Sequence, residues 1–284
     1  MSAKAKYRDL QTQIGAFYPA DEASAITAIL FEWATGISRQ QLNIFPDEEI
    51  SLDAAWKIDE GLKKLQQHQP IQYVTGEAWF YRLKFRVSPA VLIPRPETEE
   101  LVLEVLAELQ NRSASTIIDI GTGSGCIGVA IKKNSISTNV AAIDISETAL
   151  SMAKENADAN EVTIGFQQVD FLDESARDKL PVYDIIVSNP PYIPQKEKLT
   201  MDEHVAAHEP ALALFVPDNQ PLVFYEAIAE FGQTHLAENG KVFLETHEDF
   251  AGAVAEHFNQ RGYTALVKKD LFEKTRMVLA TRCH

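Results

Sequence analysis

The sequence predicts an α/β fold with a doubly wound, mostly parallel, seven-stranded sheet, preceded by a small helical domain and a connecting β-hairpin. From Ser115 onward, short apolar runs alternate with stretches of helical periodicity, which is typical of successive strand–helix units. Up to Gln69 the apolar periodicity is that of helices. We therefore expect a helical domain over residues 1–74, a hairpin linker over 75–95 and the sheet domain over 96–284.

Two helices are expected in the N-terminal domain, the first opening with the capping residue Asp21 and the second with Ser51. Apolar residues recur on one face of each helix: Ile26, Leu30, Trp33 and Ile37 in the first, and Ala55, Ile58, Leu62 and Leu65 in the second. Aromatic and β-branched residues then alternate over Gln72–Val91, which predicts the hairpin. An acidic helix start follows at Glu97–Glu100.

The sheet domain is expected to alternate strands and helices. Strands are predicted over residues 116–121, 140–145, 162–170, 183–189 and 241–246, and helices over 126–133, 147–157, 222–236 and 248–260. The last segment, residues 263–282, contains two strand-like runs without a clear helix between them. These two runs should pair as an antiparallel hairpin that closes the sheet.

Charge and composition disfavour several classes of protein. With 26 Lys and Arg against 41 Asp and Glu, the net charge is -15, and no basic segment stands out that would attract a nucleic acid. The N-terminus lacks the apolar core of a signal peptide, and no later segment has the apolar length of a membrane span. Cys126 and Cys283 have no metal-type spacing. We expect a cytoplasmic monomer without a membrane partner, a direct nucleic-acid partner or a bound metal.

A glycine-rich turn, "DIGTGSG", separates the first strand of the sheet domain from the helix that follows. This turn lies at the edge where α/β sheets bind ligands. We therefore assign cofactor contacts to its residues Gly121, Thr122, Gly123, Ser124 and Gly125. Asp144 ends the second strand, 19 residues after Gly125, where a carboxylate can accept both ribose hydroxyls of a nucleoside. A dehydrogenase that binds NAD would share both features.

Asp119, two residues before the first glycine, distinguishes between these cofactors. A carboxylate there would repel a pyrophosphate, but it suits a ligand that carries an ammonium and a sulfonium group, directly or through water. The sequence therefore favours S-adenosylmethionine over NAD. After the third strand, Asp170 could accept from the adenine amino group and Phe171 could stack on the ring; an N-cap and a core phenylalanine are the alternatives.

The fourth strand runs directly into "NPPY", Asn189 to Tyr192. An amide or aromatic NH2 group is a poor nucleophile because its lone pair is delocalised. The side-chain carbonyl of Asn189 and the backbone carbonyl of Pro190 could accept its two hydrogens and direct the lone pair to a methyl carbon. Pro191 would fix the direction of the Pro190 carbonyl, and Tyr192 offers a flat ring to a planar substrate.

With "DIGTGSG", Asp144 and "NPPY" in this order, the chain resembles the class I, Rossmann-like, S-adenosylmethionine-dependent methyltransferases that methylate amino groups. More closely, it resembles the release factor glutamine N5-methyltransferases, and the resemblance covers nearly the whole chain. Three further segments support it: Pro70–Val102 in the hairpin and linker, "HEPALAL" at His208–Leu214 and "KDLFEKTRMV" at Lys269–Val278.

The resemblance implies methyl transfer from S-adenosylmethionine, with S-adenosylhomocysteine as product, to the glutamine side chain of the Gly-Gly-Gln motif in bacterial-type class 1 release factors. It also implies that the glycine turn, Asp144, Phe171 and Asn189 contact the cofactor and that Asn189–Tyr192 hold the glutamine. The N-terminal helices would contact the release factor. The chain departs from the family pattern at Phe215–Leu222 and Glu245–Phe250, which puts the shape of those loops in question.

Three alternatives remain at this point. DNA adenine and RNA guanine methyltransferases share NPPY, although the acidic balance disfavours them. A nicotinamide dehydrogenase would explain "GSGCIG", and a non-catalytic binding module would keep the same fold. His204 and His208, four residues apart, could flank a metal, but they lack the HExxH pattern and are better explained by a solvated segment near the active site.

Overall fold

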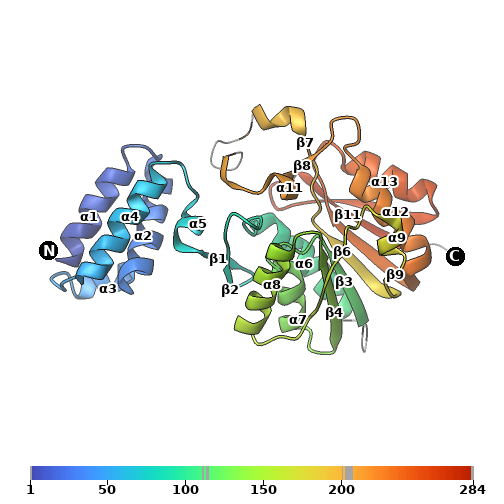
Figure 1. Ribbon diagram of the computed structural model, residues 1–284, viewed down its shortest axis with the longest axis horizontal. Coiled ribbons are helices and arrows are strands. Elements are labelled where there is room, and N and C mark those ends of the chain that lie inside the picture. The colour runs from blue at the N-terminus through green and yellow to red at the C-terminus, as the bar shows by residue number, and fades with distance from the viewer. Residues whose placement is uncertain (1, 111, 113–114, 200, 202–206, 283–284) are drawn as a thin grey trace. The chain divides into compact units, whose positions relative to one another are not determined.

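The computed structural model describes residues 2–110, 112, 115–199, 201 and 207–282. The chain forms two compact units: one comprises the described parts of residues 1–77 and 202–208, and the other those of 78–201 and 209–284 (Figure 1). Within the described residues, no helix combines the length and the apolar character needed to cross a membrane.

The first unit is helical. Its helices are α1 (Ala3–Ile14), α2 (Ala20–Thr35), α3 (Arg39–Ile44), α4 (Leu52–Leu65) and α5 (Ile71–Thr75). Ser51 caps α4 as expected, because its side chain accepts a hydrogen bond from Ala54 N at 3.1 Å. Leu30, Phe31 and Ile58 are completely buried in the core of this unit. The capping prediction for Asp21 was wrong, because the N-cap of α2 is Pro19, two residues earlier, and Asp21 lies in the first turn of the helix.

The hairpin forms, but it begins later than predicted. Residues 71–75 are the helix α5, which ends at Gly76 in a left-handed conformation, and the strands are β1 (Glu77–Phe80) and β2 (Leu83–Arg86). Phe80 and Phe85 are buried in the core of the second unit, with ring centroids 6.1 Å apart.

The seven-stranded sheet has the order β10-β11-β9-β6-β3-β4-β5. Its strands are β3 (Ser115–Ile120), β4 (Thr138–Asp144), β5 (Gly165–Gln168), β6 (Tyr183–Ser188), β9 (Leu236–Glu245), β10 (Tyr263–Lys269) and β11 (Thr275–Arg282). Five strands, β3, β4, β5, β6 and β9, run parallel to one another. β11 runs antiparallel to both β9 and β10, as the predicted terminal hairpin requires. The mostly parallel, doubly wound sheet predicted from the sequence is therefore confirmed.

Helices cover both faces of the sheet, as Figure 1 shows for α7 and α8 on one face and α12 and α13 on the other. The helices of this unit are α6 (Pro96–Leu109), α7 (Cys126–Asn134), α8 (Glu147–Ala159), α9 (Glu174–Arg177), α11 (Ala211–Leu214), α12 (Val223–His235) and α13 (Ala251–Gln260). Alternate residues of the central strands supply the two cores: Ile117 and Ile185 pack with α6 and α7, whereas Ile118 and Ile186 pack with α12 and α13.

Two elements are shorter than their predictions. The helix predicted from residue 248 begins at Ala251, and the carbonyl of Glu248 accepts a hydrogen bond from Thr275 Oγ1 at 2.9 Å, so this segment is held against β11 as a loop. The strand predicted over residues 162–170 pairs only over Gly165–Gln168, at the edge of the sheet.

The order of the strands places a ligand site at a defined point. From β3 the chain continues to β4 on one side, and β6 lies on the other side, so connections leave the middle of the sheet in opposite directions. The register pairs Ile120 with Ile143 and with Ser188, which brings the carboxyl ends of three strands to one level. A ligand is expected in the crevice beyond these ends.

Candidate functional site

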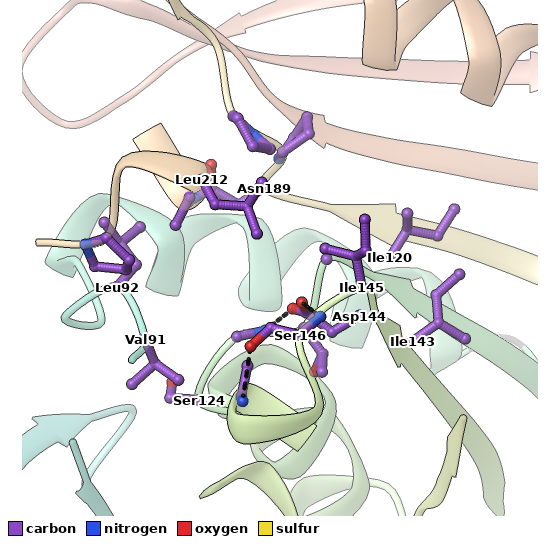
Figure 2. Close-up of a pocket in the computed structure, with 18 of the residues that line it drawn as sticks. Val91, Leu92, Ile120, Ser124, Ile143, Asp144, Ile145, Ser146, Asn189 and Leu212 are labelled. Atoms are coloured by element: carbon purple, nitrogen blue, oxygen red, sulfur yellow. Dashed lines mark hydrogen bonds between the residues drawn. The ribbon is translucent and has the colours of Figure 1, made fainter. Parts of the chain in front are cut away.

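A cavity of about 440 Å³ lies at the carboxyl ends of β3, β4 and β6. Its walls also include residues of the segment before α6 and of the segment around α11. Figure 2 shows Asn189 and Leu212 on one side of this cavity and Asp144 and Ser146 on the other, with Val91 and Leu92 at its margin. The sequence-predicted cofactor and substrate motifs thus meet around one space.

The glycine-rich turn forms one wall of the cavity and leads into α7. Gly123 and Gly125 have φ angles of 54° and 80°, in the left-handed region that favours glycine. A Cβ atom on Gly125 would lie 3.0 Å from the Cβ of Ala153 in α8, so the turn also needs glycine for close packing. Gly121, Thr122, Gly123 and Ser124 line the cavity.

Asp119 lies beneath this turn and is completely buried. Its Oδ2 accepts hydrogen bonds from Thr122 Oγ1 at 2.6 Å and Gly128 N at 3.1 Å, whereas its buried Oδ1 has no hydrogen-bond partner among the described residues. Burial raises the pKa of Asp119 to about 6. Within the part of the chain that the structure describes, Asp119 and Gly125 are not among the residues that line the cavity. Direct contact of Asp119 with a cofactor stays a prediction.

Asp144 lines the cavity at the end of β4, where it was predicted to bind a ribose. One carboxylate oxygen accepts a hydrogen bond from Gly123 N at 2.9 Å and the other from Ser146 N at 2.9 Å (Figure 2). The backbone N–H groups of Gly123 and Ser146 therefore fix the carboxylate at the wall, and each oxygen retains a further lone pair for a ligand hydroxyl.

Asp170 and Phe171 also line the cavity. The N-cap of the next helix is Asp173, and Asp170 is exposed, with one oxygen accepting from Leu172 N at 3.0 Å. Phe171 serves the core as well, because it is 4% exposed and its ring meets that of Phe231 edge to face at 5.4 Å. The two roles considered for Phe171 are thus compatible.

Asn189 is held by a chain of side-chain hydrogen bonds that sequence reasoning missed. Its Nδ2 donates to Thr98 Oγ1 at 3.1 Å, and Thr98 Oγ1 donates to Glu245 Oε2 at 2.6 Å. Tyr192 OH donates to Glu245 Oε1 at 3.4 Å. Burial raises the pKa of Glu245 to about 7, although the hydrogen bond from Thr98 opposes this shift.

The rest of NPPY is divided between the cavity and the network. Pro190 and Pro191 line the cavity together with Asn189. Among the described residues, Tyr192 does not line the cavity. Its buried hydroxyl donates to Glu245 Oε1, and burial raises the pKa of this hydroxyl well above its usual value. Whether the Tyr192 ring lies against a substrate stays a prediction.

An ion pair joins two segments that had been assigned only by resemblance. Arg95 donates to the buried carboxylate of Glu209 at 2.6 Å, and Glu209 also accepts from Ile93 N at 3.4 Å. This pair ties the segment before α6 to the segment that begins α11, and both segments line the cavity. No spacing in the sequence could have paired residues 95 and 209.

The departures from the family pattern have defined shapes. Phe215–Val216 is the strand β8, which pairs in parallel with β7 (Ile193–Pro194), directly after NPPY. Glu245 at the start of the second departure ends β9 and belongs to the network around Asn189. Of the two histidines considered as metal ligands, His204 lies outside the described residues, and a ring nitrogen of His208 lies 3.0 Å from the carbonyl oxygen of Gln67.

The residues around the cavity fit S-adenosylmethionine. Asp144 presents a carboxylate suited to ribose hydroxyls, and Ile120, Ile143 and Phe171 add apolar surface for an adenine ring. The unpartnered buried oxygen of Asp119 supplies negative charge beneath the turn, which matches a cationic ligand.

The strand order, the glycine turn and the cavity together define a class I methyltransferase. The model of the methyltransferase small domain matches residues 99–213, and that of the PrmC N-terminal domain matches residues 12–76. A methyltransferase from Pyrococcus furiosus has the same fold, with a TM-score of 0.53 and 17% identity, covering 71% of this chain and 90% of that one.

Closer relatives identify the family. The chain is 39% identical to the release factor glutamine methyltransferase of Bacteroides thetaiotaomicron, over 93% of this chain and 95% of the relative. It is 43% identical to that of Lactococcus lactis, over 82% of this chain and 83% of the relative. The chain belongs to the release factor glutamine methyltransferase family.

Proposed function

We propose that this enzyme transfers a methyl group from S-adenosylmethionine to the side-chain amide nitrogen of the glutamine in the Gly-Gly-Gln motif of class 1 release factors. The relatives with 39% and 43% identity bear the name release factor glutamine methyltransferase. The observation that carries the proposal is the orientation of the Asn189 side chain at the cavity. Its Nδ2 donates a hydrogen bond to Thr98 Oγ1, which leaves its Oδ1 to accept a substrate N–H.

The chemistry requires an environment that localises the amide lone pair. Asn189 and Pro190 both line the cavity, and we propose that Asn189 Oδ1 and the Pro190 carbonyl accept the two hydrogens of a primary amide. Accepting both hydrogens holds the NH2 group in one orientation and increases electron density on nitrogen. Proline has no N–H of its own, so its carbonyl is not accompanied by a competing donor.

When bound, S-adenosylmethionine supplies a methyl group on a positively charged sulfur, which a nitrogen can attack in line. A C–N bond forms as the C–S bond breaks, and the nitrogen then loses one proton. The protein's contribution is chiefly to position the amide, because the methylated nitrogen is acidic enough to lose its proton without a strong base. Asp144, with Asp170 and Phe171, is proposed to position the donor.

The first unit is proposed to hold the release factor. Several large apolar side chains of this unit are exposed: Ile44, Phe45, Leu52 and Trp56. Trp56, at 62% exposure, is one that a protein partner could cover. We further propose that the enzyme acts as a monomer in the cytoplasm, where release factors are found during translation.

The test is mass spectrometry of a class 1 release factor after incubation with this protein and S-adenosylmethionine. We expect one methyl group on the Gly-Gly-Gln glutamine, and no methylation of a release factor in which that glutamine is replaced. The Asn189→Ala variant serves as the enzyme control. Methylation of DNA or RNA in a parallel assay, with an unmodified release factor, would overturn the proposal in favour of a base methyltransferase.

A further inference from the structure

We propose that Thr98 and Glu245 form a hydrogen-bond relay that fixes which end of the Asn189 amide faces the substrate. The inference rests on the proposed function, since it assigns positioning roles to two residues of the same site. Thr98 lies in the first turn of α6 and Glu245 at the end of β9, so the relay connects elements that are distant in sequence to the end of β6.

The geometry of the relay is continuous and largely enclosed. The two links, Asn189 Nδ2 to Thr98 Oγ1 and Thr98 Oγ1 to Glu245 Oε2, measure 3.1 Å and 2.6 Å. Thr98 is 2% exposed and Glu245 3%. The sheet register explains the meeting point, because Ser188 pairs with Leu244, and Asn189 and Glu245 are the next residues along the two strands.

The direction of the relay follows from the number of hydrogens. An ionised carboxylate only accepts, so the single hydroxyl hydrogen of Thr98 is given to Glu245. Thr98 Oγ1 can then only accept from Asn189, and the group facing it must be the amide NH2. The carbonyl oxygen of Asn189 is thereby left for the substrate. A reversed amide would place N–H groups against the N–H groups of the glutamine and would repel it.

Both the carboxylate and the backbone of Glu245 are held by neighbouring residues. Tyr192 donates to its other oxygen, and Tyr225 OH donates to its backbone carbonyl at 3.1 Å. Arg276 of β11 favours its charged form, whereas Glu97 of α6 opposes it; Cys126 of α7 also lies within its electrostatic reach. Glu245 is therefore a positioning residue that acts through Thr98, and it need not touch the substrate.

The relay also predicts the effect of proton uptake. A protonated Glu245 can donate to Thr98, and the Thr98 hydroxyl can then donate to Asn189 and favour the reversed amide. Wild-type kcat, measured with both substrates saturating, should therefore rise with pH through the ionisation of Glu245 and level off above it. A kcat that does not change between about pH 6 and 9 would overturn the relay, and this measurement needs no variant.

The decisive comparison is between Thr98→Val and Thr98→Ser. Valine keeps the shape of threonine without the hydroxyl, so it should lower kcat by roughly tenfold or more, as expected for the loss of a buried hydrogen-bond partner. The Kd of S-adenosylmethionine, measured by calorimetry, should stay within about twofold and shows that the variant is folded. Serine keeps the hydroxyl and should recover most of the lost turnover. Thr234→Val, at an exposed position near the end of α12, controls for the substitution itself.

Each result has one meaning. Failure of the wild-type enzyme to methylate the glutamine would contradict the proposed function. Normal wild-type turnover with an equally fast Thr98→Val variant would contradict the relay alone. A Thr98→Ser variant as slow as Thr98→Val would also contradict it, because the hydroxyl would then be insufficient. Thr98 also lines the cavity, so a parallel loss of cofactor binding in Thr98→Val would assign it a role in holding the cofactor or the fold and would contradict the relay.

Discussion

Replacing Glu245 by glutamine should stabilise the second unit, by an amount that depends on pH. Glutamine has the size of a protonated carboxyl group and no charge. Burial raises the pKa of Glu245 from an ordinary 4.5 to about 7, and this difference corresponds to roughly 3 kcal/mol of unfavourable free energy for the charged form in the folded protein. Glu245→Gln removes that penalty.

The sign of the pH dependence follows from proton binding. Because the folded state binds the proton more tightly, wild-type stability falls as pH rises from the unfolded pKa to the folded one. The variant should therefore exceed the wild type by roughly 3 kcal/mol at pH 8, and by less than about 1 kcal/mol at pH 5. Asp119, whose pKa is also raised by burial, is present in both proteins and cancels in the comparison.

Hydrogen exchange can measure this difference in the intact protein. The slowest amides of β3 and β6 report the free energy of unfolding of the second unit without requiring the two units to unfold together. Wild type and variant are compared at each pH, so the intrinsic exchange rates cancel. An equal difference at pH 5 and pH 8, or a variant less stable than wild type at pH 8, would refute the reasoning.

Four further substitutions and modifications test the site. Asn189→Ala should lower turnover by roughly a hundredfold with little change in cofactor affinity, and near-normal turnover would refute its role. Asp144→Ala should weaken S-adenosylmethionine binding, and an unchanged calorimetric Kd would count against the ribose contact. Gly125→Ala should destabilise the protein by about 2 kcal/mol more than Gly123→Ala, because of these two positions only Gly125 would bring its new Cβ against α8. Chemical denaturation measures this difference, and equal losses of stability would contradict the packing. Burial raises the pKa of Cys126 to about 12, so iodoacetamide should leave this thiol unmodified in the native protein at pH 8. Rapid alkylation of Cys126, detected by mass spectrometry, would disprove its burial.

The elements that the sequence predicts well are those whose signals are local. The turn at Gly121–Gly125 and the strands around it follow from glycine spacing and apolar runs within a short window. Asp144 follows because a residue at the end of a parallel strand must lie near the turn of its neighbour. The N-cap of α2 was misplaced by two residues, since proline and aspartate both suit a helix start.

The network around Asn189 could not be predicted in the same way. Thr98 and Glu245 are separated by 147 residues, and neither has a spacing to Asn189 that repeats in a recognisable motif. Their meeting depends on the register of β6 with β9 and on the position of α6, which only the folded sheet determines. Glu245 stood out in the sequence only as the start of a segment that departs from the family pattern, not as a residue with a role.

The relay and the stability prediction give Glu245→Gln opposite effects on two properties. Apolar side chains could fill this buried place at less cost in stability, but they could not orient a hydroxyl group. A glutamine is neutral, yet it can present either its oxygen or its nitrogen to Thr98, so the direction of the relay is no longer fixed. The substitution should thus yield a more stable and slower enzyme above pH 7. This combination separates a positioning role from a structural one, because loss of a structural residue would lower stability and turnover together.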